Sequence, residues 1–576
     1  MKFHCNSLTI PKNSYFFREK FAVECISENP SIIALKYNVI QETASLLTRD
    51  RVRLDADIYR PEARGEFPVL LMRQPYGRAI ASTVVYAHPK WYASRGYIVV
   101  IQDVRGRGTS GGKFDLFVNE VEDGFESVEW ASRLPQSTGE VGMYGFSYQG
   151  MTQLYAAQSQ PSALKVLCPG MLGYNVYADW AYENGAFCLQ ANLGWSVQLA
   201  AETARLQGDF KAYQILYTAA RDLPFDNPSP PFRECLRKYA PSSFFYDWLS
   251  HPQPGEYWQQ FQPDLRKVDL PMLHIGGWFD FYLRGTLRLY REMAQQCQNP
   301  QYLIVGVWGH LPWGRKVGAI DYGFEANSPV DELQIRWFDR FLKGKDTEIQ
   351  EDPVHLFVMG RDRWQNFPTF PMVENTAYYL ASNGLANIRE DAGKLTLNCC
   401  SDEQQEDILV HDPWRPVPSL GGHAAFPSGA FERSQIDCRS DVLTYTTAPL
   451  TSEICILGQM IVELYCQADA PSFDLCAIAS EVRKNGSVYN FAQGYIRLNS
   501  RQNPVQIPLQ ETCIAIARGN CLRLSISAAC FPAYPINLGT TLFDPETNWN
   551  NAKIITIGFR SGTQFPSRIV IPINPN

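Results

Sequence analysis

A serine stands where a nucleophile would be presented, at Ser147 in the stretch G-F-S-Y-Q-G over 145–150. A short apolar run over 141–146 precedes it and a helix-compatible segment over 151–159 follows, which predicts a strand, a sharp turn and a helix with Ser147 at the apex. A turn of this kind is crowded, and glycines near the serine relieve the crowding. The usual spacing is G-x-S-x-G, whereas the second glycine here comes one residue later. Taken alone, the motif fits a nucleophile elbow and an ordinary serine in a Gly-rich connection equally well.

An aspartate and a histidine stand at positions from which they could activate this serine. A serine hydroxyl is a poor nucleophile at neutral pH, so it needs a base to take its proton and an acid to orient that base. Asp280 ends an apolar run over 269–280, and His310 is the one of the eight histidines that follows both a strand-like run, over 301–310, and a glycine. The carboxyl ends of parallel strands form the ligand-binding edge of a sheet. The order Ser147, Asp280, His310 is that of α/β-hydrolases, so the sequence predicts a catalytic triad, with an inactive copy as the alternative.

Two tyrosines are candidates for the oxyanion hole that such a triad requires. The residue after the nucleophile supplies a backbone N–H in this fold, and here that residue is Tyr148. The second donor should come from the loop after an early strand, which reads R-Q-P-Y-G-R over 73–78. The Tyr76 hydroxyl in this loop could donate to the oxyanion, and a tyrosine that merely packs under Pro75 is the alternative.

The segments that must hold these residues have the patterns of an α/β sheet. Residues 51–61 alternate apolar and polar side chains, as a half-buried antiparallel strand does. The runs over 67–73 and 96–103 are unbroken, as in strands that helices cover on both faces. Apolar residues at helical spacing predict a helix over 120–132, and 163–170 has the composition of a further buried strand.

The pattern of apolar and polar residues changes twice along the chain, which predicts an α/β fold with three parts. Aromatic-rich helical stretches without strand-like alternation begin after 170, and their Trp180 and Trp195 could line an apolar pocket or be ordinary core residues. Short alternating segments separated by Gly, Pro and Asn, with H-L-F-V-M-G over 355–360 among the first, are typical of a β-sandwich. The expected parts are an N-terminal extension (1–37), an α/β-hydrolase domain (38–170 and 268–346), a helical cap (171–267) and a C-terminal jelly-roll β-sandwich (353–576).

Composition excludes several classes of partner. The 576 residues exceed what one core usually organises, and 45% of them are hydrophobic, as in a globular protein. The net charge of −7 and the lack of a basic run argue against a nucleic acid partner. No stretch approaches the roughly 18 apolar residues of a membrane span, and the start of the chain has no signal-like apolar region. The fifteen cysteines show no metal-like spacing, so we expect reduced thiols in a cytoplasmic protein; a secreted protein that has lost its signal is the alternative.

Seven motifs together resemble the family of cocaine esterase and α-amino-acid ester hydrolase, which is grouped with X-Pro dipeptidyl-peptidases. They are G-F-S-Y-Q-G, R-Q-P-Y, D-V-R-G-R-G-T-S-G-G, G-W-F-D, W-G-H, R-W-F-D-R-F-L-K-G and D-P-W-R-P-V-P-S-L-G-G. The resemblance covers nearly the whole chain from Asn38. It implies an α/β-hydrolase domain, a helical cap and a C-terminal jelly roll, the same three parts that these changes of pattern predict.

The resemblance also implies an activity, namely a serine hydrolase that cleaves an ester or an amide of a small molecule through an acyl-serine, with no cofactor and no metal. It implies Ser147 as nucleophile, His310 as base, Asp280 as its orienter, Tyr76 and Tyr148 as oxyanion hole, and Trp180, Trp195 and Tyr282 near the acyl pocket. No nucleic acid and no membrane are expected as partners, and a homo-oligomer is plausible. One departure is Gly309, which stands where family members often carry a polar residue before the histidine.

Two other functions remain open at this point. One is an X-Pro dipeptidyl-peptidase, although the chain lacks the large N-terminal domain of the long bacterial enzymes of that kind. The other is a binding module, in which the jelly roll recognises a sugar or a peptide and the hydrolase domain is silent.

Overall fold

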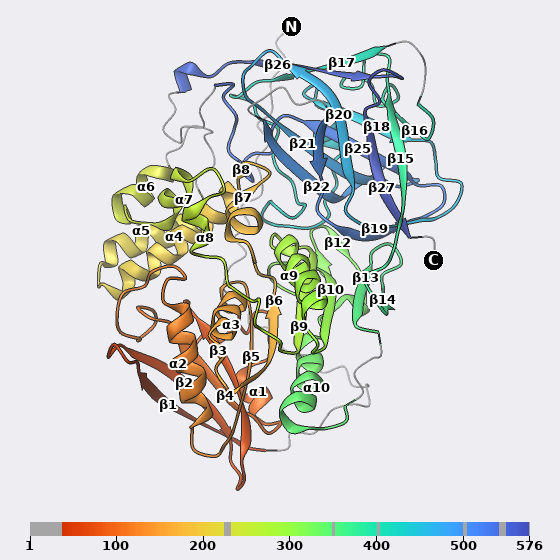
Figure 1. Ribbon diagram of the computed structural model, residues 1–576. Coiled ribbons are helices and arrows are strands. Elements are labelled where there is room, and N and C mark those ends of the chain that lie inside the picture. The colour runs from red at the N-terminus through yellow and green to blue at the C-terminus, as the bar shows by residue number, and fades with distance from the viewer. Residues whose placement is uncertain are drawn as a thin grey trace.

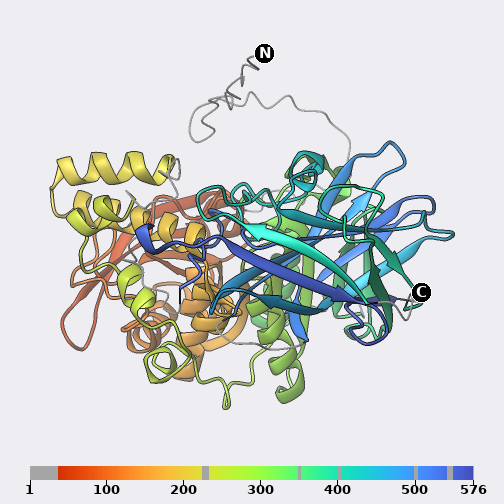
Figure 2. The same ribbon diagram turned by 90° about the horizontal axis from the view of Figure 1, so that it is seen from above.

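The computed structural model describes residues 37–223, 232–347, 352–399, 404–498, 504–540 and 549–574. The N-terminal extension expected over 1–37 lies, except for its last residue, outside these described residues. Figure 1 shows an α/β domain in the lower half, helices of the cap beside it on the left, and a β-sandwich above. Figure 2, the view from above, shows the cap helices at one end of the molecule and the strands of the sandwich at the other. The α/β-hydrolase fold with a cap and a C-terminal sandwich is therefore confirmed.

A mixed ten-stranded sheet forms the centre of the hydrolase domain, in the order β1-β2-β4-β3-β5-β6-β9-β10-β13-β14. Its strands are β1 (Val39–Leu47), β2 (Arg53–Pro61), β3 (Phe67–Gln74), β4 (Ile98–Asp103), β5 (Ser137–Phe146), β6 (Leu164–Gly170), β9 (Met272–Phe279), β10 (Gln301–Gly309), β13 (Val354–Val358) and β14 (Arg363–Phe367). The pairs from β4 through β13 are parallel, whereas β1, β2 and β14 run antiparallel to their neighbours. Strands β3, β4 and β9 are buried at every position, which explains their unbroken apolar runs.

Helices cover both faces of this sheet. They are α1 (Pro89–Ala93), α2 (Glu120–Ser132), α3 (Tyr148–Gln158), α9 (Leu283–Gln296) and α10 (Val330–Lys343). Helices α2 and α3 pack closely because Gly124 has no side chain: a Cβ there would lie 3.0 Å from Cβ of Ala156. The predicted helix over 120–132 is confirmed with the same bounds.

The hydrolase sheet extends further along the chain than expected. The segment 355–360 was expected in the β-sandwich, but β13 pairs in parallel with β10 and β14 pairs with β13, so both strands belong to the hydrolase sheet. A short alternating strand does not reveal which sheet it joins, because the partner strand is distant in sequence. The expectation for this segment was therefore wrong.

In its described residues the cap is helical apart from one small hairpin, in a segment where no strand was expected. Its elements are η1 (Val176–Ala181), β7 (Tyr182–Glu183), β8 (Ala186–Phe187), α4 (Leu189–Leu206), α5 (Phe210–Arg221), α6 (Phe232–Tyr239), α7 (Phe244–Ser250) and α8 (Glu256–Gln259). The hairpin turns at Asn184 and Gly185, which have φ of 43° and 83°. Asn-Gly is a strong signal for such a turn, and it was overlooked among the helical patterns around it.

The sandwich packs directly on the hydrolase domain. Its strands are β15 (Glu374–Ala381), β16 (Lys394–Thr396), β17 (Gln405–His411), β18 (Val442–Thr447), β19 (Ile454–Gly458), β20 (Ile461–Ala468), β21 (Phe473–Val482), β22 (Val488–Leu498), β23 (Val505–Pro508), β24 (Thr512–Ile516), β25 (Cys521–Ser527), β26 (Ile555–Ser561) and β27 (Arg568–Asn574). Three smaller elements lie between β10 and α10 of the hydrolase domain, namely β11 (Lys316–Val317), β12 (Ile320–Asp321) and η2 (Phe324–Ala326). Two others, α11 (Ser434–Asp437) and η3 (Trp549–Asn551), lie in the C-terminal part of the chain. One hydrophobic cluster runs from Trp308 at the end of β10 to Leu457 and Ile514 in the sandwich.

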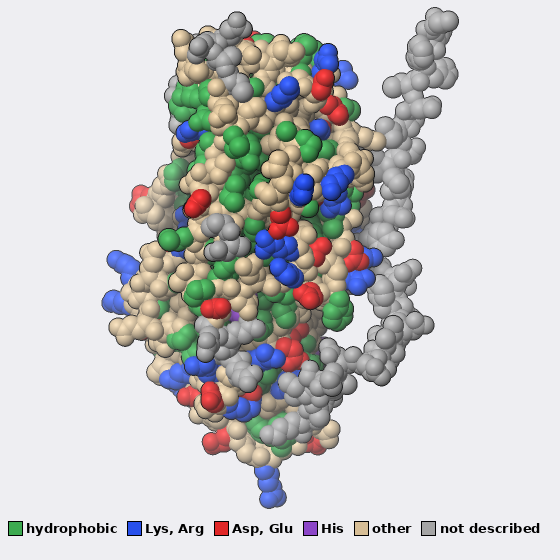
Figure 3. Space-filling view, turned by 90° about the vertical axis from the view of Figure 1, so that its right-hand side faces the viewer, with side chains coloured by type: hydrophobic (Ala, Val, Ile, Leu, Met, Phe, Trp, Pro, Cys, Tyr) green, Lys and Arg blue, Asp and Glu red, His purple; other side chains and the backbone are tan. Residues whose placement is uncertain are grey.

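One face of the molecule carries charges of both signs. The face in Figure 3 shows Lys and Arg interspersed with Asp and Glu and with hydrophobic side chains, rather than a tract of one sign. Within the described ranges, no helix is both long and apolar enough to cross a bilayer.

Candidate active site

Ser147 lies at a sharp turn between β5 and α3, as predicted. Its φ of 59° and ψ of −126° are unusual for a residue with a Cβ atom. Its backbone N–H donates to the carbonyl oxygens of Gly170 at 2.9 Å and Met171 at 3.2 Å. The side chain is 6% exposed, so Oγ stands at the edge of the sheet rather than in open solvent. A serine held in a strained conformation at a turn from strand to helix is typical of a nucleophile elbow.

The displaced glycine of the motif has a packing reason. Gly150 lies in the first turn of α3, where a Cβ would come within 2.9 Å of Leu172 Cδ2 and 3.0 Å of the Gly170 carbonyl oxygen. Gln149 occupies the place of the usual glycine, and its buried side-chain oxygen accepts the Phe146 N–H at 3.3 Å. The residue at which α3 approaches the end of β6 most closely is thus Gly150, one position later than the second glycine of the usual G-x-S-x-G motif.

This packing makes a stability prediction for Gly150→Ala. We expect the free energy of unfolding to fall by about 1–3 kcal/mol, because the new methyl group must push Leu172 and the end of β6 aside. Urea unfolding followed by circular dichroism measures the change. Gly314→Ala is the matched control, since a Cβ at Gly314 meets nothing within 4 Å. Equal stability of the two variants would contradict the packing argument.

Asp280 and His310 lie at the carboxyl ends of the adjacent strands β9 and β10 and are hydrogen-bonded to each other. The distance from His310 Nδ1 to Asp280 Oδ1 is 2.8 Å, and Asp280 is fully buried. A carboxylate only accepts hydrogen bonds, so Nδ1–H donates and Nε2 is left as the basic nitrogen. The imidazole ring packs against Phe146, the residue before Ser147, with ring centroids 5.2 Å apart.

The sandwich supports this pair from behind. Gln510 Nε2 donates to the carbonyl oxygens of Trp278 and Asp280, both at 3.0 Å. Gly309 lies against Ser428, whose Oγ would collide with any Cβ at position 309. The space beside the glycine before the histidine is therefore occupied by the Ser428 hydroxyl, which would have to turn away to admit a side chain at position 309. Sequence analysis missed Gln510 and Ser428, because no spacing connects them to strands more than 100 residues away.

Tyr76 reaches the neighbourhood of Ser147 with its hydroxyl group. Trp195 Nε1 donates to the Tyr76 hydroxyl at 3.2 Å, and this hydroxyl also interacts with the Ser147 side chain. Burial raises the pKa of Tyr76 to about 12, although both of these contacts act in the opposite direction. The hydroxyl consequently keeps its proton at neutral pH and can donate it in a hydrogen bond.

Tyr148 follows Ser147 directly, and its side chain is fixed under the elbow. As the first residue of α3, it has a backbone N–H without an acceptor inside the helix. Its hydroxyl donates to Glu120 Oε1 at 2.7 Å, and Arg73 donates to Glu120 Oε2 at 2.6 Å. Its ring stacks on Phe117 with centroids 4.8 Å apart. The buried acid Glu120 was not singled out from the sequence, although its place on an apolar helix face was a possible signal.

Aromatic rings connect the cap to the histidine. The Trp180 ring lies 5.0 Å from Trp195 and 4.6 Å from Tyr282, and the Tyr282 ring lies 5.0 Å from that of His310. Trp195 is half-buried, whereas Trp180 is 1% and Tyr282 7% exposed. The structure brings the three predicted residues together, and the fully buried Trp180 contacts both Trp195 and Tyr282.

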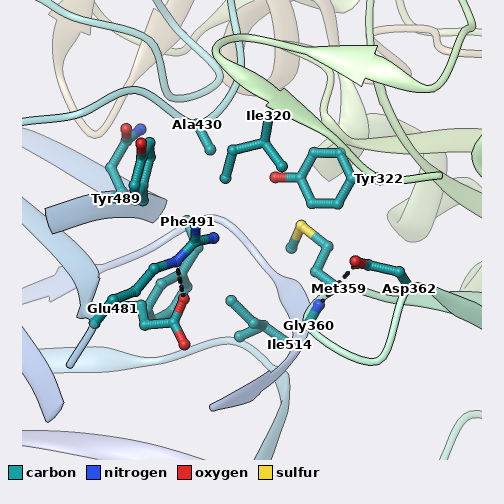
Figure 4. A pocket seen from close by; sticks show the side chains of 12 residues that line it. Ile320, Tyr322, Met359, Gly360, Asp362, Ala430, Glu481, Tyr489, Phe491 and Ile514 are labelled. Carbon is teal, nitrogen blue, oxygen red and sulfur yellow. Dashed lines mark hydrogen bonds and ion pairs between the residues drawn. The ribbon is translucent and has the colours of Figure 1, made fainter. Parts of the chain in front are cut away.

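A hollow at the junction of hydrolase domain and sandwich lies apart from these residues (Figure 4). Ile320, Tyr322 and Met359 line it on the hydrolase side, and Glu481, Arg483, Tyr489 and Phe491 on the sandwich side. Arg483 pairs with Glu481 at 3.2 Å and lies 4.5 Å from the Tyr489 ring centroid, so its charge is already satisfied. Among the described residues, no group of three or more His, Cys, Asp or Glu is placed to hold a metal ion.

Comparison with known proteins gives concordant matches. Residues 50–312 match the family model for X-Pro dipeptidyl-peptidase (S15 family), and residues 348–558 match that for the X-Pro dipeptidyl-peptidase C-terminal non-catalytic domain. Cocaine esterase from Rhodococcus sp. (strain MB1 Bresler) is 30% identical, over 91% of this chain and 97% of its own. A crystal structure of an aminopeptidase from a marine sediment Thaumarchaeota archaeon has a TM-score of 0.77 at 20% identity, covering 97% of this chain and 99% of the other. A selenomethionine-labelled α-amino-acid ester hydrolase has a TM-score of 0.75 at 18% identity, covering 98% and 100%.

Proposed function

The chain belongs to the family of cocaine esterase, a group of CocE/NonD serine hydrolases, and from that premise we propose that it hydrolyses carboxylic esters through an acyl intermediate on Ser147. The observation that carries the proposal is the 2.8 Å hydrogen bond between His310 and Asp280 at the sheet edge where Ser147 occupies a strained turn. A histidine oriented by a buried carboxylate is the base that a serine nucleophile needs.

The proposed reaction uses each group in turn. Ser147 Oγ attacks the carbonyl carbon while His310 Nε2 takes its proton, and Asp280 stabilises the imidazolium that forms. The Tyr76 hydroxyl and the Tyr148 backbone N–H donate to the oxygen that becomes negative. The tetrahedral intermediate collapses as His310 gives the proton to the leaving alcohol. Water then attacks the acyl-serine with His310 as base, which releases the acid and restores Ser147.

The aromatic lining favours an apolar acyl group. The half-buried Trp195 ring lies beside Tyr76 and the buried Tyr282 ring beside His310, and apolar walls with few polar groups are typical of small-molecule sites. The relative with 30% identity is named for an ester substrate, which supports esters over amides. The match to the S15 family model keeps dipeptidyl X-Pro amides as the second candidate.

Labelling with a fluorophosphonate probe tests the proposal. We expect one covalent adduct, on the peptide that carries Ser147, and faster turnover of p-nitrophenyl esters than of a dipeptidyl X-Pro p-nitroanilide. Faster turnover of the anilide would favour the peptidase. A protein that forms no adduct and turns over neither substrate would favour the binding module with a silent hydrolase domain.

A separate prediction concerns Tyr76→Phe. We expect kcat for an ester to fall by about 100-fold with little change in KM, because one oxyanion donor is lost in the transition state while the ring remains. Steady-state kinetics measures both constants. Tyr465→Phe on strand β20 of the sandwich is the control and should leave both unchanged. An unaltered kcat in Tyr76→Phe would remove Tyr76 from the oxyanion hole.

A further inference from the structure

Arg107 is a buried cation that no carboxylate neutralises among the described residues. It is 2% exposed, and within the described part of the chain no carboxylate lies at ion-pair distance from its guanidinium. Other buried arginines are paired, as Arg73 is with Glu120 at 2.6 Å and Arg497 with Asp474 at 2.7 Å. An isolated buried charge is expensive, so its presence calls for a compensating role.

Neutral groups hold the guanidinium in place. Its NH1 donates to the Leu199 carbonyl oxygen at 3.2 Å and to Thr203 Oγ1 at 3.1 Å, both on cap helix α4. It lies 3.8 Å from the ring centroid of Phe114, and its buried Nε has no hydrogen-bond partner. Burial lowers the pKa of Arg107 to about 10, so the group stays charged at neutral pH.

The acidic residue that attracts Arg107 electrostatically already forms an ion pair with another arginine. Glu202 belongs to the same helix, but it pairs with Arg205 at 2.7 Å. Arg105, two residues before Arg107 in the same loop, pairs with Asp50 and Asp123, both at 2.6 Å. The two arginines of this loop are thus distinct: Arg105 is neutralised by carboxylates and Arg107 is not.

Arg107 is connected to Tyr76 through helix α4 and to the Tyr148 ring through Phe114. Leu199 is one helical turn after Trp195, whose Nε1 donates to the Tyr76 hydroxyl. The Phe114 ring on which Arg107 lies is 6.1 Å from the Tyr148 ring. Burial raises the pKa of Tyr76, and the positive charge of Arg107 is among the influences that oppose this rise.

We propose that Arg107 is a positioning residue for the hydrolysis, whose buried charge acts through Tyr76 to stabilise the oxyanion and finds its counter-charge only in the transition state. The inference rests on the proposed function, because it presupposes an oxyanion at Tyr76. The carbonyl of the bound substrate is neutral, so the Coulomb attraction appears as the oxygen becomes negative and raises kcat rather than substrate affinity. Such attraction is substantial over several ångströms where water is excluded.

The experiment compares three variants of the full chain. Arg107→Gln removes the charge but keeps an amide donor for Leu199 and Thr203, Arg107→Lys restores the charge, and Thr203→Val weakens the attachment to α4 alone. Each is assayed for kcat and KM with a p-nitrophenyl ester and for inhibition by phenylboronic acid, which forms an anionic tetrahedral adduct on a catalytic serine. Thermal unfolding checks that each variant folds. If Arg107→Gln does not fold, Arg107→Met takes its place as the variant without the charge.

We expect Arg107→Gln to lose kcat and boronate affinity by the same factor, on the order of 10- to 100-fold, while KM changes little. Arg107→Lys should recover most of this loss, and Thr203→Val should resemble wild type. A Thr203→Val variant as impaired as Arg107→Gln would mean that Arg107 only braces the cap, and unchanged kinetics of Arg107→Gln would also overturn the inference. In both cases wild type would still form the fluorophosphonate adduct, whereas its absence would mean that the proposed function itself has failed.

Discussion

Replacing Ser147 with alanine is expected to lower kcat/KM for p-nitrophenyl esters by about 10⁴-fold or more, with the fold intact. Without Oγ no acyl-enzyme can form, so the remaining turnover would come from the oxyanion donors acting on water. The substitution removes one atom and leaves the backbone hydrogen bonds of Ser147 to Gly170 and Met171 unchanged. Initial rates of p-nitrophenolate release at ester concentrations well below KM measure the loss.

Ser159→Ala is a matched control for this substitution. Ser159 caps the other end of α3, where its hydroxyl donates to the Ala156 carbonyl oxygen, and it lies about 18 Å from Ser147 along the helix. This variant should retain wild-type rates. Retention of wild-type hydrolysis by Ser147→Ala would refute the serine mechanism altogether.

Asp280→Asn is expected to lower kcat/KM by roughly 10³- to 10⁴-fold. The Asp280 carboxylate accepts the Nδ1–H of His310 at 2.8 Å and is buried, so no water can take its place. The asparagine amide would offer a donor to Nδ1 and favour the tautomer with the proton on Nε2, which cannot accept the proton of Ser147. The side chains are nearly equal in size, so the loss should appear in chemistry rather than in folding.

The rate of fluorophosphonate labelling separates this tautomer effect from a general loss of charge. Asp280→Asn should slow labelling by a factor similar to that in ester hydrolysis, since both need the base. Asp264→Asn is the control, because Asp264 is exposed and pairs only with Arg266 on the surface. Its labelling rate should equal that of wild type. Near-normal labelling of Asp280→Asn would show that another group orients His310.

The local elements around the elbow could be predicted from the sequence because their signals are local. The apolar run of β5, the glycines beside Ser147 and the helix-forming segment of α3 adjoin one another. Asp280 and His310 were found in the same way, because each directly follows an apolar strand of its own. Parallel strands end at a common edge, so these local signals were enough to bring the two side chains within hydrogen-bond distance.

The groups that support the site could not be predicted, because they come from distant parts of the chain. Glu120 reaches Tyr148 across 28 residues, and Gln510 reaches Asp280 across 230. The assignment of β13 failed for the same reason, since its partner β10 is a matter of tertiary pairing. Arg107 was part of a motif in the sequence, but only burial and the position of α4 distinguish it from Arg105.

The contacts of Gln510 with the loop of Asp280 and of Ser428 with Gly309 bear on how such a chain can evolve. Its two domains look modular, and recombination could join the hydrolase half of one gene to the sandwich half of another. Such a chimera would inherit a carboxylate loop without its matching amide and a histidine loop without its matching serine. We therefore expect an exchange of halves between relatives to preserve the site best where both contacts are present in the two parent genes.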